Sequence, residues 1–130
     1  MFNFSLDQQT ESSAFDTVKK WDFLVIGGGP AGLNAALYAK RKGLVVGLIA
    51  DELGGQLHNT SIVDNYLGIK MVEGAGLSDL FVEHLKELDV PILKGVHVQE
   101  IKKQNQDFQV SLSNGKSYLS KTMLVATGGA

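Results

Sequence analysis

The sequence predicts an α/β fold with a parallel sheet, a strand–helix–strand unit and a small antiparallel excursion of three short strands. Two apolar runs, 23–26 and 44–50, flank a helical segment at residues 33–42, which is the pattern of a strand–helix–strand unit. Farther along the chain, alternating segments surround Asn114-Gly115. This dipeptide favours a tight hairpin turn, so it predicts antiparallel strands on either side.

The first helix has start and stop signals of its own. Pro30 and Ala31 open the segment, and residues 40–42 place three basic side chains in its last turn, where they complement the helix dipole. Gly43 follows as a C-terminal cap. We therefore expect the chain to reverse here and to enter the second strand.

The second half of the chain predicts one helix followed by short strands. Apolar residues recur at helical spacing between Gly76 and Leu88, which indicates an amphipathic helix. Strands are then expected at residues 91–93, 96–101, 108–112, 117–119 and 122–126. The last of these is an apolar run that we expect to be buried in the parallel sheet.

Composition limits the classes of function. The chain has 130 residues, of which 44% are hydrophobic and 20% charged, as in one globular domain. A net charge of −2 argues against a binder of duplex nucleic acid. The longest apolar run, 44–50, is too short to span a bilayer. Residues 1–7 lack the basic and apolar regions of a secretory signal, so we expect a cytoplasmic protein.

Two parts of the chain differ in character. Residues 1–20 are polar without clear periodicity, and we expect an N-terminal tail or arm whose Phe2, Phe4 and Phe15 could dock onto the body. Residues 21–130 form the predicted domain. The chain has no cysteine, which excludes disulfides, thiolate chemistry and cysteine-ligated metals within it. Its three histidines show no ligand spacing, so no metal site and no catalytic residue are expected in this chain.

A glycine-rich loop gives the most specific functional signal. Gly27, Gly29 and Gly32 fit the pattern G-x-G-x-x-G directly after a strand and at the start of a helix. In that context Gly27 allows the tight turn, Gly29 lets the backbone approach a pyrophosphate, and Gly32 lets helix and strand pack closely. The pattern predicts a Rossmann-like FAD/NAD(P)-binding domain. The alternative is a glycine-rich turn without a ligand.

An acidic residue follows the second predicted strand. Dinucleotide-binding folds place an acid at the end of this strand, where it binds the ribose hydroxyls. Here Ala50 ends the strand and Asp51 follows. Asp51 is therefore a candidate for ribose binding, with a solvated loop carboxylate as the alternative.

Four blocks of residues resemble one family. They are Gly27-Gly-Gly-Pro-Ala-Gly-Leu-Asn-Ala-Ala-Leu-Tyr-Ala39, Gly54-Gly-Gln-Leu57, Val63-Asp-Asn-Tyr-Leu-Gly68 and Ala126-Thr-Gly128. In order and spacing, residues 21–130 resemble the first FAD-domain segment of low-molecular-weight thioredoxin reductases and related pyridine nucleotide-disulfide oxidoreductases. The resemblance implies a homodimeric enzyme in which NAD(P)H reduces FAD, and FAD reduces a disulfide of thioredoxin or another redox protein.

The resemblance also implies a set of cofactor-binding residues. The first block would hold the FAD pyrophosphate, the second and third would lie along the flavin, the strand at 96–98 would pass the adenine, and the fourth would close over the cofactor. Together with the strand-ending acid, the expected residues are Gly27, Gly29, Pro30, Ala31, Gly32, Asp51, Gly55, Gln56, Leu57, Asn65, Val98, Ala126, Thr127 and Gly128.

The sequence departs from the family pattern in three ways. It stops at Ala130, without the nucleotide domain that carries Cys-x-x-Cys and without the return segment that completes the FAD site, so we expect a truncated or split protein. His58 stands where the family often has Thr, and Leu67 where it commonly has Pro. His58 could tune the flavin, act as an acid or be an exposed loop histidine. His84 and His97 are interpreted as structural.

Three functions are compatible with these residues. The first is the FAD-binding part of a thioredoxin-reductase-like flavoprotein. The second is a ferredoxin–NADP reductase of the thioredoxin-reductase-like type, which needs no cysteines. The third is a non-catalytic nucleotide-binding subunit that needs a partner chain. FAD is favoured over NAD(P) because Ala50 ends the second strand, Gly54-Gly-Gln-Leu57 follows, and residues 96–119 replace a helical crossover.

Overall fold

The computed structural model describes residues 15–53 and 74–127, and these form one α/β unit. Its elements, in chain order, are β1 (Trp21–Ile26), α2 (Pro30–Arg41), β2 (Val46–Ala50), α3 (Gly74–Glu87), β3 (Ile92–Lys94), β4 (Val98–Gln104), β5 (Asp107–Leu112) and β6 (Ser117–Val125). The predicted α/β fold class and the strand–helix–strand unit β1–α2–β2 are confirmed.

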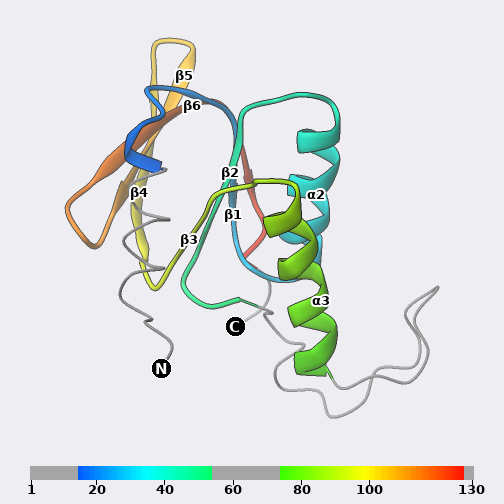
Figure 1. The fold of residues 1–130 in the computed structure, drawn as a ribbon. Helices are drawn as coiled ribbons and strands as arrows, with labels where there is room; N and C mark the ends of the chain where they lie inside the picture. Colours follow the sequence, from blue (N-terminus) through cyan, green and yellow to red (C-terminus); the bar gives the residue numbers. More distant parts are fainter. Residues whose placement is uncertain (1–14, 54–73, 128–130) are drawn as a thin grey trace.

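All six strands belong to one sheet, in the order β3-β2-β1-β6-β5-β4. The first four strands of this order run parallel, with β1 at the centre between β2 and β6. The antiparallel pairs β6–β5 and β5–β4 form the predicted three-stranded excursion. Figure 1 shows α2 and α3 together on one side of the parallel strands, away from β4 and β5.

The last strand differs from the prediction. The sequence suggested two strands, 117–119 and 122–126, but β6 is continuous from Ser117 to Val125. Its first half pairs with β5, and its second half pairs with β1. Ser120 lies at the exchange point, in register with both Phe108 of β5 and Trp21 of β1. One strand therefore joins the antiparallel and parallel parts of the sheet.

Two hydrophobic cores cover the two faces of the parallel strands. The first lies under the helices and includes Val25, Leu33, Ala36, Leu48, Leu85 and Ile92. The second lies on the other face and includes Phe15, Trp21, Leu24, Ile49, Leu93, Val110, Leu112 and Tyr118. Because β1 and β2 contribute residues to both cores, they are apolar over residues 23–26 and 46–50, as in parallel sheets buried on both sides.

Phe15 belongs to this second core although it precedes the predicted domain boundary. It is fully buried, and its ring centroid lies 4.6 Å from that of Trp21 and 5.4 Å from that of Tyr118. Gly47 leaves room for these rings, since a Cβ there would come within 2.8 Å of Phe15 and 2.9 Å of Trp21. The neighbouring Asp16 is anchored as well, by the Tyr118 hydroxyl at 2.9 Å and the Lys116 ammonium at 2.6 Å.

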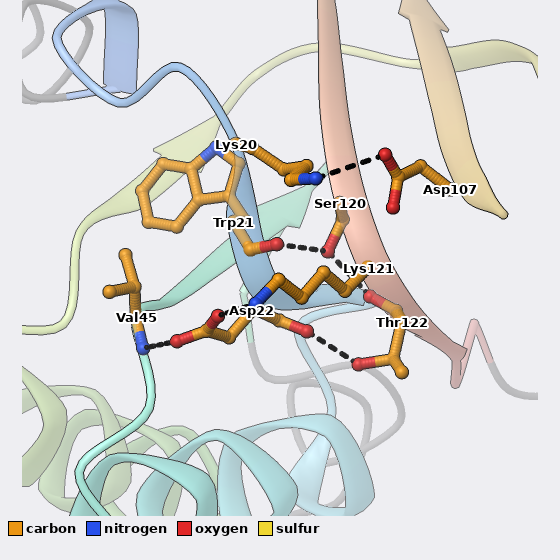
Figure 2. Close-up of polar contacts among 8 residues, drawn as sticks. All are labelled: Lys20, Trp21, Asp22, Val45, Asp107, Ser120, Lys121 and Thr122. Carbon is orange, nitrogen blue, oxygen red and sulfur yellow. Dashed lines mark hydrogen bonds and ion pairs between the residues drawn. The ribbon is translucent and has the colours of Figure 1, made fainter. Parts of the chain in front are cut away.

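Polar contacts tie the strands together at their amino ends (Figure 2). The carboxylate of Asp22 accepts the N–H of Val45 at 2.8 Å, and the Asp22 carbonyl accepts the Thr122 hydroxyl at 2.6 Å. The hydroxyl of Ser120 lies 2.6 Å from the carbonyl oxygen of Thr122 and 3.3 Å from that of Trp21, so either can accept its one proton. These bonds fix β1 against both of its neighbours at the end of the sheet opposite the glycine loop.

The described helices do not reach the length and apolar character that a membrane-spanning helix requires. Neither do residues 15–53 and 74–127 bring together a group of three or more His, Cys, Asp or Glu side chains that could hold a metal ion.

Candidate dinucleotide-binding site

The candidate site lies where the parallel strands end. Strands β1, β2, β3 and β6 all present their carboxyl ends to the same edge, at the lower side of the sheet in Figure 1. From β1 the chain moves to β2 on one side, whereas β6 returns on the other side. Such a reversal of strand order is the topological switch point at which open α/β sheets bind ligands.

The glycine loop meets the end of β6 at Gly27. This residue has a φ of +132°, a backbone conformation that residues with a Cβ rarely adopt. A Cβ at Gly27 would also overlap the carbonyl oxygen of Ala126. The Ala126 amide donates to the Ile26 carbonyl at 2.7 Å, which keeps this part of β6 against the loop. The glycine loop and the residue that follows β6 are therefore in direct backbone contact.

Gly28 and Gly32 allow two further close approaches. A Cβ at Gly28 would overlap the carbonyl oxygen of Glu52 and lie 3.0 Å from Cα of Leu53. A Cβ at Gly32 would lie 2.5 Å from the carbonyl oxygen of Gly27 and 3.1 Å from Cγ1 of Val25, so glycine lets α2 pack directly onto β1. The role of Gly28 was missed because the pattern G-x-G-x-x-G leaves its position open. The run of three glycines was the available signal.

The amino end of α2 has the features of an anion site. Gly29 is the N-cap and contributes no capping side chain, Pro30 follows at the first helical position, and the first turn has no acidic residue. The first amides of a helix have no partner within the helix, and its dipole favours a negative group there. A phosphate group is the ligand that this arrangement suits. Gly29 itself has an ordinary φ of −81°, so its backbone does not require glycine.

Most of the remaining described candidates lie at the same edge. Asp51 follows β2 directly, and its exposed carboxylate lies 2.8 Å from Nδ1 of His97. Val98 begins β4, half-buried, directly after His97. Ala126 and Thr127 follow the end of β6. Several predicted residues lie outside the described residues, namely Gly55, Gln56, Leu57, Asn65 and Gly128. The same holds for the two departures from the family pattern, His58 and Leu67.

Three ionisable side chains with shifted pKa values belong to the opposite edge. Hydrogen bonds from Lys116 and Tyr118 lower the pKa of Asp16, and burial raises the pKa of Tyr118. The N–H of Val45 lowers the pKa of Asp22. The lowered pKa values favour the ionised carboxylates of Asp16 and Asp22, whereas the raised pKa of Tyr118 favours its neutral hydroxyl. Among the described residues, the carboxyl edge instead presents the glycine loop and the exposed carboxylates of Asp51 and Glu52.

Comparisons with known proteins agree with this geometry. Residues 21–130 match the family described as pyridine nucleotide-disulphide oxidoreductase. An alkyl hydroperoxide reductase component from Staphylococcus aureus is 35% identical over 123 residues, a match that covers 95% of this chain and 24% of the relative.

Two solved structures have similar folds. Thioredoxin reductase from Streptococcus pyogenes gives a TM-score of 0.81 at 36% identity, covering 86% of this chain and 36% of that one. A ferredoxin-flavin thioredoxin reductase from Clostridium acetobutylicum gives 0.78 at 34% identity, covering 87% and 39%. The chain thus spans 24% of the curated relative's length and well under half of each solved structure.

Proposed function

We propose that this chain, which belongs to the pyridine nucleotide-disulphide oxidoreductase family, is the FAD-binding part of a thioredoxin-reductase-like flavoprotein. One observation carries the proposal: the glycine loop after β1 leads into the uncapped amino end of α2 and packs against the ends of β2 and β6. This is the arrangement in which a dinucleotide pyrophosphate is bound by backbone amides.

The chain's own residues would bind and orient the cofactor. The amides at the start of α2 would receive the pyrophosphate, and Gly29 would let the backbone approach it. Asp51 would accept hydrogen bonds from the ribose, while Ala126 and Thr127 would border the cofactor beside β1. Bound FAD would supply the electron-transfer chemistry, which the protein tunes by contact and charge.

The complete protein would pass electrons from NAD(P)H through FAD to a disulfide. Because this chain has no cysteine, the residues that exchange the disulfide must lie in another segment or chain. The second half of β6 has β1 on one side, and no described strand pairs with its other side. That edge, where Val125 is 57% exposed, offers a place for a further segment.

Several features of the complete protein are proposed from the family relationship alone. They are the homodimer, the thioredoxin-like acceptor, the cytoplasmic location and the domain that binds NAD(P)H. A second candidate function is a ferredoxin-linked reductase. It is favoured by the similarity to the ferredoxin-flavin thioredoxin reductase. A parent reading frame that continues into Cys-x-x-Cys would favour the first candidate.

A ligand titration tests the proposal. We expect the 130-residue chain to bind FAD more tightly than NADH, measured by flavin fluorescence and calorimetry. A Gly29→Val variant should lose most FAD binding and keep its fold, because the φ of −81° suits any residue. Lys42→Val at the other end of α2 is the control and should bind FAD normally. Tighter binding of NADH would contradict the flavin assignment, and binding of neither would contradict the proposed dinucleotide site in this chain.

A further inference from the structure

Asp51 and His97 form a side-chain pair at the edge of the candidate site. Asp51 lies directly after β2, and His97 lies in the connection between β3 and β4. Nδ1 of His97 is 2.8 Å from Oδ2 of Asp51, within hydrogen-bond distance. The exposed fractions of the two side chains, 69% and 60%, leave the pair open to a ligand.

The backbone on both sides of this pair is held in place. The N–H of His97 donates to the Ser113 hydroxyl at 3.0 Å, and the His97 carbonyl accepts the Ser113 N–H at 2.8 Å. The N–H of Gly95 donates to the carbonyl oxygens of Ala50 and Asp51 at 3.0 and 3.1 Å. The turn after β5 therefore fixes His97, and the connection after β3 fixes the backbone of Asp51.

We propose that His97 is a positioning residue that orients the Asp51 carboxylate toward the cofactor ribose, and that Ser113 holds His97 in place for this purpose. The inference rests on the proposed binding of FAD. A carboxylate has two oxygens that accept hydrogen bonds. With Oδ2 bound to the Nδ1–H of His97, Oδ1 is available to a ribose hydroxyl.

The hydrogen bond from His97 lowers the conformational entropy that the Asp51 side chain loses when a ligand binds. An exposed side chain samples several rotamers, and a ligand that needs one of them loses affinity by about threefold to tenfold for ordering it. The hydrogen bond from His97 selects the rotamer before the ligand arrives. Neither residue type at either position predicts this arrangement, because the two are brought together by the pairing of β2 with β3, by the connection after β3 and by the turn after β5.

A double-mutant cycle tests whether His97 acts through Asp51. FAD dissociation constants are measured for the 130-residue chain, Asp51→Ala, His97→Ala and the double variant. We expect Asp51→Ala to weaken binding about tenfold, as for loss of a hydrogen bond to a charged group. His97→Ala alone should weaken binding about threefold to tenfold, and it should add nothing in the Asp51→Ala background. Full additivity, or no effect of His97→Ala, would overturn the proposal.

Conservative variants separate positioning from a general structural role. The amide nitrogen of His97→Asn can donate from the place of Nδ1 and should restore affinity, whereas His97→Gln places its amide near Nε2 and should not. His84→Ala, an exposed histidine on α3, is the matched control and should bind FAD normally. Equal losses in the Asn and Gln variants would contradict positioning by Nδ1.

A measurement without ligand completes the test. In nitrogen NMR of the histidine rings at neutral pH, His97 should carry its proton on Nδ1, and Asp51→Ala should shift the proton toward Nε2. If the His97 ring signals are the same in the wild type and in Asp51→Ala, the hydrogen bond between His97 and Asp51 is not formed in solution. Failure of the wild-type chain to bind FAD would refute both the proposed function and the positioning role. If the wild-type chain binds FAD and the His97 variants bind it equally well, only the positioning role is refuted.

Discussion

The carbonyl oxygen of Ala126 occupies the space in which a Cβ of Gly27 would lie. Gly27 also has a φ of +132°, so an alanine there meets both an atomic overlap and a strained backbone. We expect Gly27→Ala to lower the free energy of unfolding by about 3 kcal/mol or more. The measurement is denaturant unfolding of both proteins.

Gly43→Ala provides the control for this substitution. Gly43 has a φ of +85°, but no described atom would lie within 4 Å of an added Cβ. Its cost should therefore be the backbone strain alone, about 1 kcal/mol. Equal costs for the two variants would show that the contact with Ala126 does not restrict Gly27.

Phe15 is expected to behave as a residue of the domain core. It is fully buried between Trp21 and Tyr118, so Phe15→Ala leaves a cavity and should destabilise the fold by about 3–5 kcal/mol. Lys19→Ala, at an exposed position in the same segment, should change stability by less than about 0.5 kcal/mol. Thermal and denaturant unfolding measure both. A small effect of Phe15→Ala would place the domain boundary at residue 21.

Asp22 is expected to make stability depend on pH. The N–H of Val45 and the nearby Lys121 lower the pKa of this carboxyl below its usual 3.8. A lowered pKa in the folded state stabilises the fold above the usual pKa, and this stabilisation is lost as pH falls through the lowered value. Asp22→Asn should therefore be less stable than the wild type at neutral pH.

The difference in unfolding free energy between these two proteins should shrink as pH falls below about 3.8, the usual value of the carboxyl pKa. Asp79→Asn, on the exposed face of α3, removes the same charge without these partners and serves as the comparison. A difference between wild type and Asp22→Asn that stays constant down to pH 2 would argue that the charge of Asp22 does not matter.

The isolated chain should not catalyse disulfide reduction. With no cysteine in its 130 residues it cannot form the mixed disulfide through which thiol–disulfide exchange proceeds. NADPH and a chromogenic disulfide, followed by absorbance, should show no turnover with this chain, while an intact thioredoxin reductase in the same assay gives the positive signal. Turnover that rises in proportion to the concentration of this chain would contradict the expectation.

Local signals predicted much of the fold. The strand β1, the helix α2 and its end at Gly43, and the turn at Asn114-Gly115 each follow from a few adjacent residues. The turn is closed by bonds from Gly115 to Leu112 and from the Lys116 amide to the Asn114 side chain. Such local signals predict the structure well because the hydrogen bonds and backbone conformations they indicate form among the same adjacent residues.

Features that depend on distant partners were not predictable in the same way. The continuity of β6 depends on Phe108 and Trp21, which meet Ser120 from opposite sides. The crowding at Gly28 comes from the loop after β2. Within the candidate site, the glycine pattern and Asp51 were readable from the sequence. The hydrogen bond from His97 was not, because it depends on the pairing of β2 with β3 and on the turn after β5.

Because β6 pairs with both β1 and β5, the sheet cannot be completed until late in the synthesis of this chain. Trp21 and Ser120 are 99 residues apart in the sequence, yet they are neighbours at the centre of the sheet. While the ribosome is still adding residues before β6, the emerging β1 has one edge uncovered, and its apolar side chains are exposed to other nascent chains. Contacts between such distant residues form slowly. Until residue 125 has emerged, β1 therefore keeps one unpaired edge, the kind of exposed strand edge that makes folding intermediates prone to aggregate.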